Sequence, residues 1–163
     1  LKNYFQKNKK IKYNHLINRL LGNQELAYKQ YNINESRLNS EIKLISLFSK
    51  NILGYIDYEM VGNKRKNNFQ YLSKNLNKKN TLNIPGNYKS APICYPFFPN
   101  DDIDRKIFLE NNIFIPTYWK RTEYIIERGF DFEKDLAEKL LPLPIDHRYD
   151  EKDLKRIVDL INK

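Results

Sequence analysis

The chain has 163 residues, of which 40% are apolar and 30% are charged. This composition excludes a disordered segment, and no apolar run approaches the roughly 20 residues that a membrane-spanning helix needs. A single cysteine, Cys94, excludes an internal disulfide framework and indicates a reducing compartment. We therefore expect a folded cytoplasmic protein that does not contact a membrane.

The formal net charge of +9 is concentrated in two stretches, residues 1–12 and 61–80, which contain basic residues but no acid. Such stretches can neutralise phosphates. However, no zinc-ligand spacing, aromatic RNA-binding signature or recognition-helix pattern accompanies the charge, and lysine is abundant throughout the chain. We therefore do not expect nucleic acid to be a partner.

The N-terminal segment, residues 1–35, is predicted to be a partly helical linking segment. Its clearest apolar cluster, residues 16–21, predicts a short helix that ends at Gly22, and the residues that follow have no clear apolar period. The chain begins with Leu1, and its only methionine is Met60. Because a translated protein starts with methionine, we expect the chain to be a fragment.

Two helices are predicted next along the chain. Apolar residues recur every three or four positions between Leu38 and Ile56, which predicts a long amphipathic helix over residues 36–58. A second helix is predicted over residues 61–77, with its lysines on a solvated face. Its apolar face carries Phe69, Leu72 and Leu76.

Three short apolar runs that contain proline predict strands near residues 91–98, 113–119 and 141–145. Further helices are predicted over residues 100–111, 132–140 and 150–162, with N-terminal caps at residues 100–102, at Asp131 and at Asp150. The expected fold class is α/β, as an α+β two-layer domain over residues 36–163. Its small, mainly antiparallel sheet is covered by helices and preceded by the long helix.

Three segments together resemble the C-terminal small domain of the DegT-type sugar aminotransferases, which are fold type I pyridoxal-phosphate enzymes. KRKNNFQYL, with Arg65, Asn68, Phe69 and Leu72, resembles the R-x-x-N-F-x-x-L helix that opens this domain. Residues 91–119 resemble its strand–helix–strand unit, and residues 141–161, LPLPIDHRYDEKDLKRIVDLI, resemble its closing segment. The resemblance covers about residues 36–163.

The resemblance implies that the catalytic parts of the enzyme lie in a larger N-terminal domain. That domain would hold the lysine that forms the aldimine, the acid facing the pyridine nitrogen and the phosphate cradle. Nothing in this chain corresponds to the strand that carries that lysine. We therefore expect no catalytic residue, bound cofactor or metal in this chain; pyridoxal phosphate is implied for the complete family protein. The implied partners are the large domain or a second copy in a dimer, and a small-molecule substrate such as a nucleotide-linked sugar.

The resemblance also implies candidate substrate-binding residues at the strand ends nearest the family's cleft. These are Tyr118, Trp119, Lys120, Arg148 and Tyr149. A guanidinium group can bind a carboxylate or phosphate through two hydrogen bonds, and aromatic faces suit sugars or bases.

Structural roles for the same residues remain open. Arg148 could instead pair with Asp146 or Asp150 and order the turn before the last helix, which is the interpretation we favour. The aromatic residues among the candidates could serve packing alone. His147 is not expected to be catalytic, and Cys94, within an apolar run, is expected to be an inert buried thiol.

A second hypothesis is that the chain is not part of an enzyme. As a non-catalytic module, it would bind a partner through the predicted long helix, or an anion through its basic stretches. Whether the chain is part of an enzyme is therefore left open by its residues.

Apolar residues within 11–21 and 38–56 lead to a prediction about association. In an isolated chain they would form an exposed apolar surface, and such surfaces usually bind a partner. We expect self-association through residues 1–56, measured by multi-angle light scattering as a mass that rises with concentration. A monomer that persists at high concentration would contradict this expectation.

Overall fold

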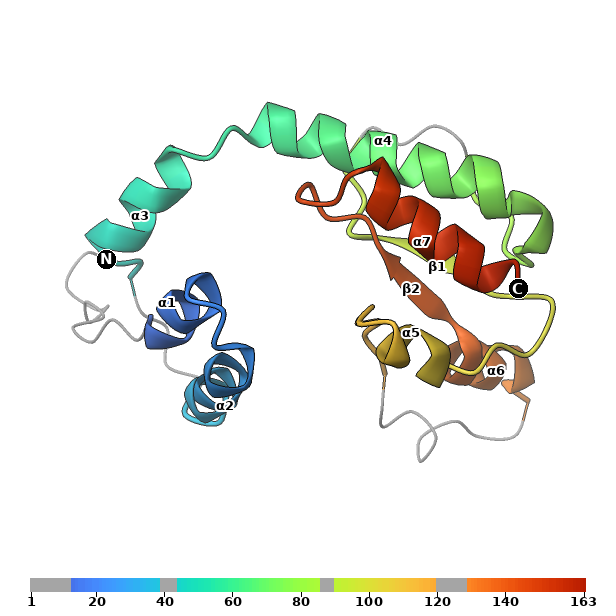
Figure 1. Ribbon diagram of the computed structural model, residues 1–163, viewed down its shortest axis with the longest axis horizontal. Coiled ribbons are helices and arrows are strands. Elements are labelled where there is room, and N and C mark those ends of the chain that lie inside the picture. The colour runs from blue at the N-terminus through green and yellow to red at the C-terminus, as the bar shows by residue number, and fades with distance from the viewer. Residues whose placement is uncertain (1–12, 39–43, 86–89, 120–128) are drawn as a thin grey trace. The chain divides into compact units, whose positions relative to one another are not determined.

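The computed structural model describes residues 13–38, 44–85, 90–119 and 129–163 (Figure 1). Contacts divide the chain into two units, residues 1–56 and residues 57–163. Each unit is described by itself below. Across the described residues, no helix is long and apolar enough to cross a membrane.

The first unit begins with two helices that pack on each other, α1 (Asn14–Leu20) and α2 (Gln24–Glu35). The chain reverses at Gly22, whose φ of 81° is the left-handed conformation expected after a helix. Polar contacts join the pair, because Asn18 Nδ2 donates to Gln30 Oε1 at 3.0 Å. The helix at α1 was predicted, whereas α2 was not, because its sequence shows no clear apolar period.

The predicted long helix over residues 36–58 is wrong. The structure has only α3 (Leu47–Gly54) within the described part of this range, and residues 39–43 lie outside the described residues. Ser46 starts α3 as its N-cap, because its hydroxyl accepts a hydrogen bond from the Ser49 amide at 3.0 Å. Asp57 then caps the next helix through the Met60 amide at 2.9 Å. The Ser46 cap therefore divides the apolar stripe, and the Asp57 cap begins a new helix directly after it; the apolar period reveals neither cap.

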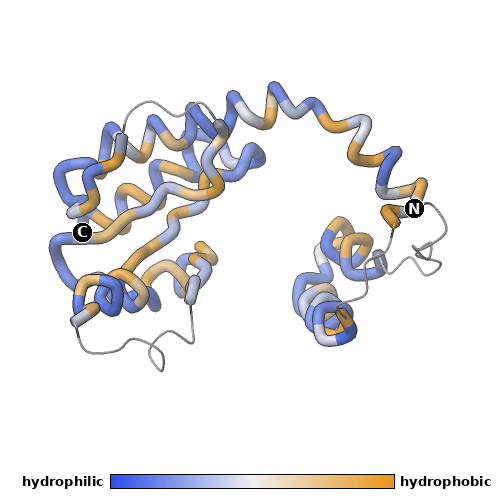
Figure 2. Tube along the Cα trace, turned by 180° about the vertical axis from the view of Figure 1, so that it is seen from behind, coloured by the Kyte–Doolittle hydropathy of each residue, from blue (hydrophilic) through white to orange (hydrophobic). Residues whose placement is uncertain are grey.

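Most apolar side chains of the first unit are exposed. Figure 2 shows where the hydrophobic residues lie along the chain. Ala27 is the one buried side chain among its described residues, and α3 has none. The most exposed apolar side chains are Leu20, Leu21, Leu38, Leu47 and Tyr55. The exposed surface on which the association prediction depends is therefore present in the described part of this unit.

The second unit opens with α4 (Tyr58–Leu76), which continues into a single 3₁₀ turn, η1 (Asn77–Lys79). The prediction of a helix over residues 61–77 is confirmed. Its buried face carries Asn68, Phe69, Leu72 and Leu76. The phenyl ring of Phe69 meets the ring of Tyr95 edge-on, with 5.1 Å between centroids.

The sheet contains two antiparallel strands, β1 (Cys94–Phe97) and β2 (Leu141–Pro144), and both were predicted. Tyr95 lies opposite Leu143 and Phe97 lies opposite Leu141, so these four buried side chains share one face. α4 and α7 (Glu151–Ile161) contribute to the same core (Figure 1). The mixed α/β class, as an α+β arrangement, is confirmed.

Prolines occupy matching positions on the two strands. Pro96 lies opposite Pro142, and Cys94 lies opposite Pro144. Because proline has no N–H, these must be the non-hydrogen-bonded pairs of the ladder, in which backbone groups point away from the partner strand. Both outer edges of the sheet therefore lack N–H donors at the proline positions, which explains how two short strands accommodate three prolines.

The third predicted strand, residues 113–119, is wrong. These residues form no strand, although Ile113 and Phe114 line the same pocket as Pro144 at the end of β2. The outer edge of β2 offers no N–H at its two prolines, so a ladder cannot form there. Instead, the Arg105 guanidinium bonds to Thr117 Oγ1 at 2.8 Å and also to the Leu140 carbonyl oxygen.

The helix predicted over residues 100–111 is shorter, and its proposed cap is wrong. α5 (Lys106–Glu110) begins after Asp104, whose carboxylate accepts the Lys106 amide at 2.9 Å. Asn100 instead accepts a hydrogen bond from Thr81 Oγ1 at 3.2 Å. The predicted end of the helix is confirmed, because Asn112 has a φ of 58°.

The last two helices also begin differently from each other. α6 (Asp131–Lys139) has no side-chain cap, so the role predicted for Asp131 is wrong. α7 begins with a capping box, in which Asp150 accepts the Asp153 amide at 3.0 Å and Asp153 accepts the Asp150 amide at 3.1 Å. This cap was predicted. The buried apolar face of α7 carries Leu154, Ile157, Val158 and Ile161.

Asn80 closes the outer edge of β1. Its amide nitrogen donates to the Pro96 carbonyl at 3.0 Å and to the Tyr95 hydroxyl at 3.2 Å. Its amide oxygen accepts from the Phe98 amide at 3.0 Å and from the Leu82 amide at 3.1 Å. This nearly buried side chain thus supplies the pairing that a neighbouring strand would otherwise give.

We predict that Asn80→Ala destabilises the second unit by about 3 kcal/mol, because it removes the hydrogen bonds that the Asn80 side chain makes to buried backbone groups and to the Tyr95 hydroxyl. Urea unfolding followed by far-UV circular dichroism measures this change. Asn77→Ala is the matched control, since Asn77 is exposed one turn earlier. Equal losses in the two variants would contradict the role of Asn80.

Candidate functional site

The predicted substrate-binding residues lie in two places of the second unit. Tyr118 and Trp119 follow the irregular segment after α5, and Arg148 and Tyr149 lie in the loop between β2 and α7. Lys120 lies outside the described residues. α4 carries two side chains at the candidate site, one turn apart. Asn68 bonds to the loop between β2 and α7, and Arg65 bonds to the Ile93 carbonyl, next to the Cys94 that Tyr118 contacts.

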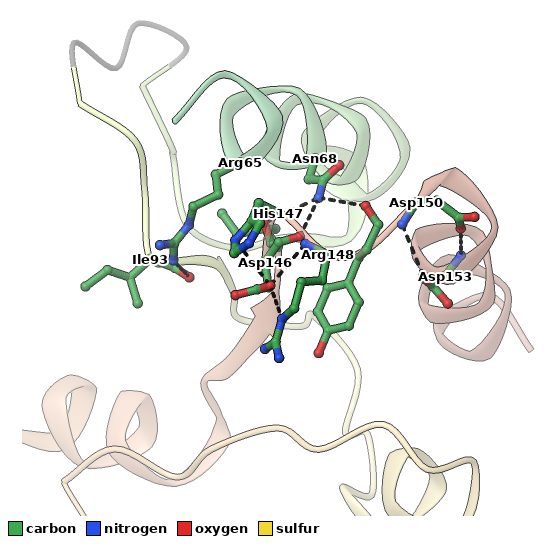
Figure 3. A network of polar contacts seen from close by, with 10 residues as sticks. Arg65, Asn68, Ile93, Asp146, His147, Arg148, Asp150 and Asp153 are labelled. Carbon is green, nitrogen blue, oxygen red and sulfur yellow. Dashed lines mark hydrogen bonds and ion pairs between the residues drawn. The ribbon is translucent and has the colours of Figure 1, made fainter. Parts of the chain in front are cut away.

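Asn68 holds the loop between β2 and α7 (Figure 3). Its amide nitrogen lies 2.9 Å from the Asp146 carbonyl oxygen and 3.4 Å from the carbonyl oxygens of Ile145 and Tyr149. Asn68 is itself 3% exposed, so these contacts are shielded from water. Asn68 on α4 therefore fixes the backbone conformation of residues 145–149.

Within this loop, the Asp146 carboxylate contacts Arg148 and His147. Its Oδ1 accepts hydrogen bonds from Arg148 Nε at 2.6 Å and from the Arg148 amide at 3.1 Å, and His147 Nδ1 lies 3.5 Å away. Partial burial acts to raise the pKa of Asp146, but the hydrogen bonds and charge of Arg148, with a smaller contribution from His147, lower that pKa below its ordinary value. The same hydrogen bond and charge raise the pKa of Arg148.

Arg148 is thus paired as the local interpretation predicted. Its side chain is 73% exposed and uses Nε for Asp146, so its terminal nitrogens face solvent with no hydrogen bond to any described residue. A planar guanidinium held at one nitrogen can still bind a carboxylate or phosphate with the others. The ion pair with Asp146 therefore orients the Arg148 side chain and leaves its terminal nitrogens available. The role of Arg148 toward a substrate stays a prediction.

Arg65 and Tyr118 both lie near Cys94, the first residue of β1. Arg65 Nη2 donates to the Ile93 carbonyl at 2.8 Å, while its Nε is buried and has no hydrogen-bond partner among the described residues (Figure 3). Burial raises the pKa of the Cys94 thiol, and a hydrogen bond with Tyr118 and the charge of Arg65 lower it only in part. Burial, with the neighbouring Cys94, also raises the pKa of Tyr118. Cys94 is half-buried rather than buried as predicted. A thiol with a raised pKa is a poor nucleophile, which agrees with the inert role expected for it.

Trp119 adopts an unusual backbone conformation. Its φ is 56°, which is uncommon for a bulky residue and costs conformational energy. The indole is 56% exposed, and its ring lies edge-on to Tyr118 with 5.8 Å between centroids. Tyr118 is anchored to Cys94, so the aromatic pair is attached to the sheet. The sequence gives no signal for this conformation, because tryptophan has no preference for positive φ.

The site therefore offers an exposed guanidinium, an exposed aromatic pair and a fixed loop, which are recognition groups. Among the residues that the structure describes, no group of three or more histidine, cysteine, aspartate or glutamate side chains could hold a metal ion.

Comparisons with protein-family models, with curated proteins and with solved structures find no match.

The lowered pKa of Asp146 predicts a pH-dependent contribution to stability. The contribution is complete above the ordinary pKa of 3.8 and is lost as the pH falls through the lower pKa of the folded state. Asp146→Asn, which keeps an acceptor oxygen, should therefore reduce the free energy of unfolding at pH 7, and the difference from the parent chain should shrink below about pH 4.

Urea unfolding at a series of pH values measures this difference. Asp159→Asn, which changes an exposed aspartate on α7, is the control for the loss of one carboxylate. A loss from Asp146→Asn that is the same at pH 7 and at pH 3 would show that the charge of Asp146 is not responsible.

Proposed function

We propose that residues 57–163 are the small domain of a pyridoxal-phosphate-dependent aminotransferase-like protein that acts on a sugar or a related metabolite. The observation that supports this proposal is the packing of the three segments on which the resemblance depends. Arg65 bonds to Ile93, Phe69 packs on Tyr95, and Asn68 holds the loop after β2. The residue types of the R-x-x-N-F-x-x-L pattern thus each have a physical role on one face of α4.

The described residues do not fit pyridoxal phosphate itself. Holding this cofactor requires a lysine in a shaped pocket and donors around the phosphate. Every described lysine is exposed or half-buried, and Lys79 is engaged with the Ile161 carbonyl at 3.2 Å. We therefore assign this chain no step of transamination.

The role proposed for this domain is substrate recognition. Arg148 would contact an anionic group of the substrate, and the ring faces of Tyr118 and Trp119 would contact a sugar or a base. Tyr149, next to Arg148, is half-buried at the start of α7 and is proposed to support that contact. The cofactor and the lysine that binds it would come from a large domain.

The test is covalent labelling with pyridoxal phosphate and borohydride, followed by mass spectrometry of the modified lysines. We predict that residues 1–163 alone give only scattered, substoichiometric labelling, because no described lysine lies in a cofactor pocket. The product of the complete reading frame should give one stoichiometric adduct on a lysine outside these residues.

The two samples separate the possible outcomes. A stoichiometric adduct on one lysine of residues 1–163 would show that the chain holds the cofactor itself. No stoichiometric adduct on the complete product would contradict the aminotransferase-like assignment. The labelling of denatured chain is the control for intrinsic lysine reactivity.

A further inference from the structure

A small pocket lies in the second unit between the residues that follow α5, the end of β2 and the first turns of α7. Its volume is about 100 Å³. An apolar cavity of ~150 Å³ takes a benzene ring, so this pocket suits a ligand of only a few heavy atoms. Apolar lining comes from Ile113, Phe114, Pro144 and Ile157.

The pocket also carries two opposite charges from α7, Asp153 and Arg156. They are three residues apart, yet they form no ion pair with each other or with any other described residue. Arg156 uses one nitrogen to donate to the Asn111 carbonyl at 3.1 Å. Asp153 uses Oδ2 to accept the Asp150 amide, and its carboxylate also interacts with the Asp150 side chain. Each group therefore keeps hydrogen-bonding capacity for a ligand.

The charges restrict the class of ligand. An anion on Arg156 would be repelled by Asp153, and a cation on Asp153 would be repelled by Arg156. A small molecule that carries both charges satisfies both groups, and its short apolar part meets Phe114 and Ile113. The half-buried Tyr149 adds one further polar group to the lining.

We propose that this pocket binds a small zwitterion of about the size of alanine, with its carboxylate on Arg156 and its ammonium group on Asp153. This site is separate from the exposed terminal nitrogens of Arg148 and does not depend on the proposed aminotransferase-like function. It gives the domain a binding activity for a free amino acid of minimal side chain.

The test is titration of the ¹⁵N-labelled full chain with L-alanine, propionate and ethylamine at constant pH and ionic strength. Alanine should give saturable shifts at the amides of residues 112–114 and of the first turns of α7. Propionate and ethylamine, which each lack one charge, should bind roughly tenfold more weakly, because each loses one charge-assisted hydrogen bond.

Variants that remove one charge test which residue binds the carboxylate of the ligand and which binds its ammonium group. Asp153→Asn keeps an amide oxygen for the cap of α7; it should weaken alanine binding roughly tenfold while strengthening propionate binding. Arg156→Gln should weaken alanine binding by a similar factor without weakening ethylamine. A merely structural role of Asp153 would not strengthen propionate binding.

Lys155→Gln, which removes an exposed positive charge next to Arg156, is the matched control and should leave alanine binding unchanged.

Three outcomes would overturn the proposal. The first is the absence of saturable shifts with alanine in the parent chain. The second is equal binding of propionate and alanine, which would show a simple anion site. The third is an equal effect of Lys155→Gln and Arg156→Gln, which would show a response to overall charge.

Discussion

The second unit depends on a sheet that cannot grow. Pro96, Pro142 and Pro144 remove N–H donors along both outer edges, and no further strand among the described residues pairs with β1 or β2. A two-stranded sheet is marginal by itself and needs helices packed on it for stability. Here α4 and α7 cover the face that carries Tyr95 and Leu143, and Asn80 satisfies the backbone at the outer edge of β1.

The same constraint explains why side chains rather than strands connect the parts of this unit. Asn68 and Asn80 each bind several backbone groups, and Arg105 joins the segment after α5 to the start of β2. The Arg105 guanidinium is partly buried, and this burial lowers its pKa. Loops held in this way can present exposed groups, such as Arg148 and Trp119, at fixed positions.

Local signals in the sequence predicted the elements that local chemistry determines. Asp150 and Asp153 form the expected capping box, and the apolar periods of α4 and α7 became their buried faces. The predictions failed where a distant partner decides the outcome. The run 113–119 has strand-like residues, but the edge it would join has no donors, and this follows only from the register of β1 and β2.

For the candidate site, the sequence indicated the pairing of Arg148 with Asp146, because the two residues are close in the chain. It did not indicate that Tyr118 meets Cys94, or that Asp153 and Arg156 line one pocket with Phe114, since these contacts join separate segments. Whether any of these residues binds a substrate depends on partners that no periodicity encodes.

The aromatic pair after α5 has a practical consequence. Trp119 is the single tryptophan of the chain, so the intrinsic fluorescence excited at the red edge of protein absorption comes from one position. That position is half exposed, lies against Tyr118 and has a backbone conformation that other packing must maintain. The chain therefore contains its own optical reporter of this segment, and a change of emission on adding a partner or metabolite can be assigned without an attached dye.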